Sequence, residues 1–457
     1  MWPDYRYRDN AMREAPAFVS SNQWPELRVV LDPLVPRDEA AFEYFDFLRT
    51  RASGIRILTR CDNPLPSRVG DYYVVVPDVP SASGDAAVRE RVEAGQASRA
   101  MFSGIRNCSA AYSRASASGY DPNEARERHL DVEAAIALKA DIYVTDNRFA
   151  LSQQLTGNVF SCSPREAMAI VGLHQRLQDR LLINSGVFAE TLDLTAAEYV
   201  EAWGLLPNTL RLFSLQTPEE AEAARWKDLV RVARVRLERC LRARDQILVR
   251  SIHPRVSFPF DGNDALVERV SLNISGMFDA LARAIREGLS LPVRDDQCAF
   301  NKRDFKRVLP AGIKNLIGTP KNVALMKAVA DLRNTIHHEA LSHAAQGDSR
   351  GNVEENYVVL PASNAQDFRG WAGTLGATSR WIATDFDDFG LNLRAVPLVE
   401  DLMKQSVSLF EAIVAQVEWP GTINPELRVR EDEPVEWWMH FTPTVTLVSA
   451  LYGLELE

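Results

Sequence analysis

The hydrophobic pattern of this chain changes near residue 190, and that change constrains the fold more than any other feature. Up to about residue 180, short apolar runs typical of strands, such as LRVVLDPL, GIRILTRC, DYYVVVPD and DIYVTDN, alternate with segments of helical spacing. Beyond residue 190, helical spacing persists through four long stretches. Alternating strands and helices predict a parallel sheet covered by helices, whereas sustained helical spacing predicts a bundle. We therefore expect an α/β domain followed by an all-α domain.

The same change gives the domain boundaries. We predict the α/β domain over residues 1–190, a connector over 191–224 and a helical bundle over 225–457. Two strand-like pieces, NYVVLPA and RWIATDF, interrupt the helical pattern, so the bundle is expected to carry an insertion around residues 345–395. A chain of 457 residues is too long for one hydrophobic core, which agrees with two domains.

Composition excludes several classes of protein. The chain is 46% hydrophobic and 25% charged, as folded globular proteins are. No run approaches about 18 apolar residues, and the first residues lack the apolar core of a signal peptide. We therefore expect a cytoplasmic protein with no membrane partner. The five cysteines are widely spaced and form no CxxC pair, so neither a zinc site nor a disulfide framework is expected.

The charge distribution leaves nucleic acid open as a partner. The net charge of −10 disfavours a general nucleic-acid binder. Two segments are nevertheless basic: residues 225–250 hold nine basic and three acidic side chains, and residues 301–327 hold seven basic side chains and one acid. Such bands can follow a phosphate backbone. The alternative is that they are solvated faces of helices that pack on their other side.

Acidic side chains stand where the predicted strands end. Asp32 ends the run RVVLD, Asp146 ends IYVTD, and Asp131 is expected to begin the helix that leads into the second of these strands. The carboxyl ends of parallel strands open into a crevice where ligands bind. Carboxylates that converge there repel one another unless a cation lies among them, and oxygen ligands suit Mg²⁺ or Mn²⁺. Such ions can hold a phosphate and activate the attacking water.

The segment DVEAAIALKADIYVTDNRFAL resembles the PIN-domain family of α/β ribonucleases, and the resemblance extends over roughly residues 25 to 180. It implies that Asp32, Asp131 and Asp146 are ligands of Mg²⁺ or Mn²⁺. The middle acid of the family is usually a helical glutamate, for which Glu90 and Glu93 lie in the corresponding region. We assign that ligand to Glu93.

Each of these acids also has a purely structural interpretation. Asp32 could cap the following helix or make a turn. Asp131 could be a helix N-cap, where a carboxylate is favoured by the helix dipole. The pair Asp146 and Asn147 could form a turn after a strand.

A second group of chemically active side chains lies in DLRNTIHHEAL, from Asp331 to Leu341. Three of the seven histidines of the chain fall in or directly after it. Arg333 and His337 are four apart and share a helical face, whereas Arg333 and His338 are offset by about 140°. Helix geometry alone therefore favours His337 as the partner of Arg333.

The run RNTIHH resembles the motif of the HEPN family, which has an arginine, a polar residue, three further residues and a histidine. HEPN domains are helical bundles, many of them metal-independent ribonucleases whose sites form across a dimer. The resemblance covers about residues 225 to 345 and the helix near 397–418. It implies that Arg333, Asn334 and His338 form a catalytic site, completed in a homodimer. His337 is then a supporting neighbour.

The chemistry of this second site requires no metal or other cofactor, because RNA supplies its own nucleophile, the 2′-hydroxyl. A histidine can transfer the protons, and an arginine can hold the phosphate. We expect Lys314, Lys321 and Lys327 to bind the RNA backbone and Asp279 to orient an arginine or histidine. The alternative is that the histidines lie on the helix surface and Arg333 pairs with Asp331.

The sequence thus predicts an endoribonuclease or RNA-targeting effector, of the kind found in toxins or phage defence. The alternative is a non-catalytic protein that binds RNA or a protein partner through degenerate nuclease domains and dimerises through its bundle. A third hypothesis is that the helical part binds nucleotides.

Overall fold

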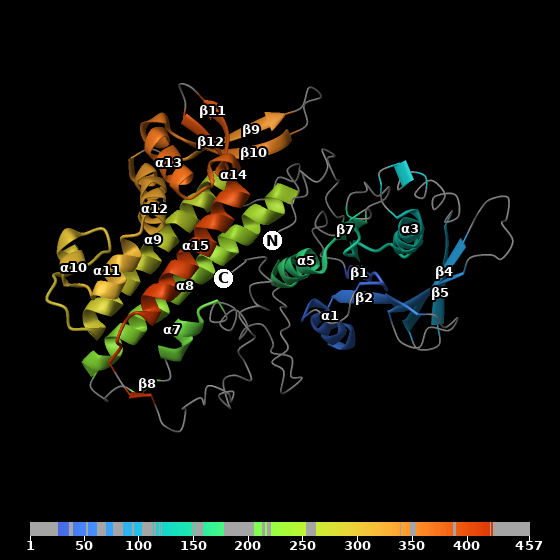
Figure 1. The fold of residues 1–457 in the computed structure, drawn as a ribbon, viewed down its shortest axis with the longest axis horizontal. Helices are drawn as coiled ribbons and strands as arrows, with labels where there is room; N and C mark the ends of the chain where they lie inside the picture. Colours follow the sequence, from blue (N-terminus) through green and yellow to red (C-terminus); the bar gives the residue numbers. More distant parts are fainter. Residues whose placement is uncertain are drawn as a thin grey trace. The chain divides into compact units, whose positions relative to one another are not determined.

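The computed structural model of the protein divides into two compact units, which are described separately (Figure 1). The structure describes residues 26–35, 40–51, 54–61, 70–75, 86–93, 96–102, 113, 116–117, 119, 121–148, 151, 159–177, 205–212, 215–216, 221–252, 262–338, 340–347, 353–386, 390–420 and 422–423.

The first unit is built on a sheet whose central part is parallel. Its parallel strands lie in the order β3-β2-β1-β6-β7, which are Asp71–Val75, Ile55–Arg60, Leu27–Leu31, Ile142–Val144 and Phe160–Cys162. Strands β1, β2, β3 and β6 fall in the four apolar runs of the sequence, so these predicted strands are confirmed. Near-continuous burial of β1 and β6 agrees with strands that are covered on both faces.

The prediction of a wholly parallel sheet is wrong at one edge. Strands β4 (Ala86–Glu93) and β5 (Gln96–Phe102) extend the sheet beyond β3, and both pair antiparallel. The physical reason is the short connection: two residues separate β4 from β5, which suffices for a hairpin but not for a parallel crossover. The sheet is therefore mixed, and Glu90 and Glu93 lie on a strand rather than on a helix.

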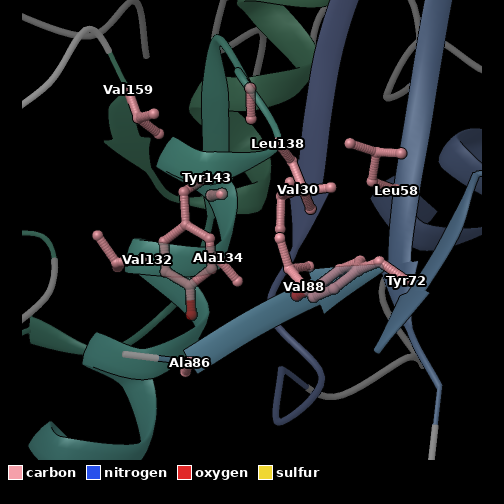
Figure 2. Packing of buried hydrophobic residues seen from close by; sticks show 12 residues of the cluster. Val30, Leu58, Tyr72, Ala86, Val88, Val132, Ala134, Leu138, Tyr143 and Val159 are labelled. Atoms are coloured by element: carbon pink, nitrogen blue, oxygen red, sulfur yellow. The ribbon is translucent and has the colours of Figure 1, made fainter. Parts of the chain in front are cut away.

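One face of this sheet is covered by the alanine-rich helix α3 (Pro122–Ala137). Figure 2 shows Val132, Ala134 and Leu138 beside Val30, Leu58, Tyr72 and Val88 of the strands. The small alanines bring the helix backbone close to the sheet, and Tyr72 and Tyr143 are fully buried there. Burial of each large apolar side chain contributes about 1.5–3 kcal/mol, so this cluster is a major source of the stability of the unit.

Helix α3 begins earlier than the sequence suggested. Pro122 occupies its first position, and Asp121 accepts a hydrogen bond from the Asn123 amide at 2.9 Å. A proline in the first turn preceded by an aspartate is a strong start signal. Asp131 therefore lies well inside the helix, and the expectation that it begins the helix is wrong.

Helices α1 (Ala40–Arg51) and α5 (Pro164–Leu177) cover the other face. Arg49 forms an ion pair with Asp71, whose side chain points away from the α3 face because it alternates with that of Tyr72. The Tyr44 hydroxyl donates to Gln175 at 2.8 Å and so joins the two helices.

Helix α5 begins with a hydrogen-bonded cap. The Ser163 amide and hydroxyl donate to Glu166 at 2.8 and 3.0 Å, and the Glu166 amide donates back to the hydroxyl at 3.3 Å. These reciprocal bonds form a capping box ahead of Pro164.

The second unit contains four long helices, as the sequence predicted. They are α8 (Ala221–Ile252), α9 (Asn263–Gly288), α12 (Pro320–His338) and α15 (Ala395–Ala415). Helices α8 and α9 pack side by side over much of their length, and α15 packs on both (Figure 1). Shorter elements are the 3₁₀ turn η3 (Asp295–Gln297) and the helices α7 (Pro207–Leu212), α10 (Arg303–Val308) and α11 (Ala311–Ile317).

A carboxylate of the last long helix caps the first short one. Glu411 of α15 accepts hydrogen bonds from the amides of Asn208 at 2.6 Å and Thr209 at 3.2 Å, and from the Thr209 hydroxyl at 2.5 Å. These amides belong to the first turn of α7, where N–H groups have no acceptor within the helix, so a buried negative charge there is stabilised by the helix dipole. Nearby, the rings of Trp226 and Trp419 stack with centroids 4.8 Å apart.

The predicted insertion is a small antiparallel sheet with two helices. Its strand order is β11-β12-β10-β9, which are Ile382–Phe386, Gly390–Arg394, Val353–Leu360 and Ser342–Gly347. Helices α13 (Ala362–Thr374) and α14 (Thr378–Trp381) connect β10 to β11. Strands β8 (Leu215–Gln216) and β13 (Thr422–Ile423) pair separately. Among the described residues, none of the helices has the length and apolar character needed to span a bilayer.

Candidate functional site

The first candidate site lies where the strand order of the sheet reverses. From β1 the chain proceeds to β2 and β3 on one side, and later to β6 and β7 on the other. In open α/β sheets, ligands bind beyond the carboxyl ends of the strands at such a switch point. Asp32 follows the end of β1 at this position, as predicted.

Asp32 is held firmly by its neighbours. Its carboxylate accepts hydrogen bonds from the Thr145 hydroxyl at 2.6 Å and from the Leu34 amide at 3.0 Å, and its own amide donates to Val144 at 2.9 Å. Only 2% of the residue is exposed. The turn predicted as an alternative role for Asp32 is therefore present, and the same carboxylate also ties β1 to β6.

Asp131 reaches the end of the neighbouring strand from α3. Its carboxylate accepts a hydrogen bond at 2.9 Å from Arg60, the last residue of β2, and only 1% of Asp131 is exposed. Tyr72 lies beside this pair: burial raises the pKa of its hydroxyl well above the usual value, and the negative charge of Asp131 raises it further. Arg60 provides a positive charge beside the buried Asp131 carboxylate.

A small cavity lies between Asp32 and Arg60, the partner of Asp131. It has a volume of about 10 Å³, room for about one water molecule, and both Asp32 and Arg60 line it. Asp46 of α1 lines it too, and sequence reasoning missed this residue. The signal was its spacing: Asp46 is four residues after Phe42, which is buried, so the two share a helical face.

The other two predicted metal ligands lie differently. Asp146 is exposed, directly after Thr145 at the carboxyl end of β6. Glu93 ends β4; because Glu90 is opposite Tyr72 in an antiparallel pair, Glu93 lies beyond the amino end of β3. The side chain of Glu93 is outside the described residues. The structure thus places Asp32 and Asp146 after the carboxyl ends of β1 and β6, and Asp131 on α3 beside the last residue of β2. Glu93 lies elsewhere.

Glu90 serves a different purpose. It is buried and accepts a hydrogen bond from Arg28 at 2.6 Å, with Arg56 at 3.4 Å. Two arginines compensate this carboxylate, so it acts as an internal counter-ion on the α3 face of the sheet.

The acids of this site bind protein donors in the structure. No group of three or more histidine, cysteine, aspartate or glutamate side chains suited to a metal occurs among the residues that the structure describes. Asp32 binds protein donors, and Asp131 binds Arg60. Arg60 already binds one oxygen of the Asp131 carboxylate, so the metal stays a prediction and no chemical step is derived through it.

The second candidate site lies on α12, at the side chain of Arg333. The Arg333 guanidinium donates to the hydroxyl of Ser275 on α9 at 3.2 Å. Asp331, the alternative partner considered from the sequence, instead accepts a hydrogen bond from the Trp371 indole at 2.8 Å. Burial raises the pKa of Asp331 above its usual value. Arg333 is therefore positioned by a neutral hydroxyl, which leaves its positive charge without compensation by Asp331.

Arg333 lines a cavity of about 130 Å³ between α9, α12 and the segment that leads into α10. The polar groups on its wall include Asp279, Lys306 and Lys327, and its apolar wall includes Phe278, Phe300, Ile317 and Val329. Asp279 was considered from the sequence as an orienting group. Ser275 and Lys306 were not assigned to the site; the signal for Ser275 was its position four residues before Asp279, on the same face of α9.

The remaining predicted residues of this unit lie on α11 and α12. Asn334 is exposed on α12, and His337 and His338 end that helix, with side chains outside the described residues. Lys314 and Lys321 are exposed, and the Lys314 ammonium donates to the carbonyl oxygen of Arg307 at 2.8 Å. Of the three predicted RNA-binding lysines, Lys327 is the one that shares the cavity with Arg333.

Comparisons with protein-family models, with curated proteins and with solved structures find no match to this chain.

Proposed function

We propose that this chain is an RNA-binding endoribonuclease and that its helical unit cleaves RNA at Arg333 without a metal ion. The observation that carries the proposal is the position of the Arg333 guanidinium, held by Ser275 on the wall of a cavity that Lys306 and Lys327 also line. Three cations and one carboxylate around a cavity favour an anionic ligand. A phosphodiester fits these groups, because an arginine can donate two parallel hydrogen bonds to phosphate oxygens.

In the proposed reaction, the 2′-oxygen of a ribose attacks the adjacent phosphorus. A bond from the 2′-oxygen to phosphorus forms, the bond from phosphorus to the 5′-oxygen breaks, and the products are a 2′,3′-cyclic phosphate and a 5′-hydroxyl. One group accepts the proton of the 2′-hydroxyl and another returns a proton to the 5′-oxygen. Arg333 stabilises the charge that builds up on the phosphate.

The proton-transfer group in this proposal is His338, with His337 as the competing candidate from helix spacing. Both residues end α12, five and four positions after Arg333. The HEPN resemblance further implies that a second copy of the chain completes the site, so the active species is proposed to be a homodimer. Size-exclusion chromatography with light scattering tests that state directly.

A cleavage assay with purified protein, single-stranded RNA and EDTA tests the proposed function. We expect EDTA-resistant cleavage that yields 2′,3′-cyclic phosphate ends and is lost in Arg333→Ala. Arg369→Ala is a matched control, because Arg369 is an exposed arginine of α13 away from this cavity. No cleavage by the wild type, or equal cleavage by Arg333→Ala, would overturn the proposal. Growth arrest on induction of the wild type but not of Arg333→Ala would support a toxin or defence role.

A second candidate is a protein that binds RNA or a protein partner without cutting. The ion pair between Arg60 and Asp131 favours it for the α/β unit, because the arginine occupies an acid that a catalytic metal would need. In this case RNA binding by the full chain persists in EDTA while no product appears. A Mn²⁺-dependent cleavage lost in Asp146→Asn would exclude it.

A further inference from the structure

The cavity beside Arg333 has the size and lining of a site for one nucleotide. We infer that it binds a pyrimidine nucleotide unit of single-stranded RNA, with the base inside and the phosphate at the cationic rim. The inference rests on the proposed function and deepens it, because it names the part of the substrate that this cavity recognises.

The volume of the cavity limits the size of the base that it can hold. The cavity holds about 130 Å³. An apolar protein cavity of about 150 Å³ binds benzene, a single six-membered ring. A pyrimidine is a ring of that size, whereas a purine adds a second fused ring. The cavity therefore fits the smaller class of base.

The apolar wall suits a flat ring. Phe278 and Phe300 are buried and lie edge to face, with ring centroids 6.2 Å apart, and Ile317 and Val329 complete this side. Proteins that recognise single-stranded RNA hold unstacked bases against aromatic and apolar side chains. The rigid pair of rings gives such a base a preformed surface.

The polar groups suit the edge of the base and its phosphate. Asp279 lies on the wall one helical turn from Ser275 and can accept a hydrogen bond from a ring-edge N–H, as carboxylates do from the cytosine amino group. Lys306 and Lys327 are exposed, and Arg333 is fixed by Ser275. A phosphate at this rim meets three cations, while the base meets the apolar wall and one acceptor.

Binding of 2′-O-methyl oligonucleotides, which lack the nucleophile, tests the inference by fluorescence anisotropy. We expect the wild-type chain to bind oligo(C) or oligo(U) about 10-fold or more tightly than oligo(A). Ala330 lines the cavity, so Ala330→Phe fills it without changing its charge and should remove the preference. Ala415→Phe, at an exposed alanine that ends α15, is the matched control. Equal thermal unfolding of the two variants checks that both are folded.

The outcomes separate this inference from the proposed function. If the wild type cleaves RNA but Ala330→Phe keeps the pyrimidine preference, the cavity is not the base site and the ribonuclease proposal stands. If the wild type binds CMP or UMP over AMP in calorimetry but cleaves nothing, the inference stands and the ribonuclease proposal fails. If no oligonucleotide and no nucleotide binds, both are overturned.

Discussion

Arg60 and Asp131 form an ion pair of 2.9 Å between the end of β2 and the middle of α3. The carboxylate is almost completely buried, whereas the arginine side chain is 31% exposed. Moving the partly exposed Arg60 side chain into solvent has a moderate cost in free energy, whereas a buried Asp131 charge without a counter-ion is strongly unfavourable. This asymmetry allows the metal prediction to be tested through Arg60.

Arg60→Ala should destabilise the α/β unit by roughly 3 kcal/mol, because it leaves the Asp131 carboxylate buried without its counter-ion. If the acids bind a metal, Mn²⁺ should restore much of that stability in thermal unfolding experiments. The control is Arg60→Ala with Asp131→Asn, in which no charge is left to compensate and Mn²⁺ should have no effect. Unfolding of Arg60→Ala at the wild-type temperature would show that the ion pair is unimportant.

Changes at Asp32 and at Asp146 should have different effects: loss of a hydrogen bond to Asp32 should lower stability, whereas loss of the Asp146 charge should affect only cleavage. Thr145→Val removes the hydroxyl that donates to Asp32, and we expect a loss of about 1–3 kcal/mol in unfolding free energy. Asp146→Asn should leave stability unchanged, because Asp146 is exposed. If Mn²⁺-dependent cleavage is present, Asp146→Asn should abolish it. Denaturant titration and the cleavage assay together make this comparison, and a strong loss of stability in Asp146→Asn would contradict it.

The two histidines that end α12 should differ in their effect on EDTA-resistant cleavage. His338→Ala should lower the rate by about 10²–10⁴-fold if the HEPN register holds, because the proton-transfer group is lost. His337→Ala should then have a small effect. The reverse order would show that simple helix spacing determines the pair. Cleavage that survives both changes and Arg333→Ala would make all three residues structural.

A buried histidine and a partly buried aspartate of the α/β unit should give opposite pH dependences. Burial lowers the pKa of His174 to about 4, so the unfolded chain binds its proton more readily and stability rises as pH increases from about 4 to 6.5. Burial raises the pKa of Asp141 to about 6, although the hydrogen bond that its carboxylate accepts from the Arg28 amide lowers the pKa. The folded chain therefore binds that proton more readily, and stability falls as pH increases from about 3.8 to 6.

Each effect amounts to about 3 kcal/mol, so the two nearly cancel in the wild type between about pH 4 and 6. His174→Gln should become less stable relative to the wild type as pH rises through this window, and Asp141→Asn should become more stable. Chemical denaturation at several pH values measures these differences, and taking the difference from the wild type removes the contribution of other groups. Parallel pH curves for all three proteins would refute the assignment.

Much of the fold could be predicted from the sequence because its elements have strong local signals. The four apolar runs became strands of the first sheet, and the start of α5 followed its serine, proline and glutamate. The hairpin of β4 and β5 was missed, since small and charged residues such as Ala86 and Arg89 give no clear alternation. The start of α3 was misplaced because the alanine-rich part dominates its pattern, although Asp121 and Pro122 marked the true beginning.

The sites were harder to predict, because they depend on contacts between distant segments. The position of Asp32 beyond β1 followed from strand order alone. Its partner Thr145 is 113 residues away, and Arg60 is 71 residues from Asp131. No local pattern reports such pairs. For the same reason, Ser275 and Lys306 beside Arg333 become visible only when α9, α10 and α12 pack together.

The cap that Glu411 places on α7 has a consequence for synthesis of the protein on the ribosome. The described strands and helices of the α/β unit end by Leu177, so they are synthesised before those of the helical unit. Helix α7, by contrast, is complete at Leu212 but lacks its cap until a residue about 200 positions later has emerged. The stacking partner of Trp226, Trp419, is likewise synthesised much later than Trp226 itself. The helical unit therefore gains this cap and this stacked pair only after α15 and the residues that follow it have been synthesised.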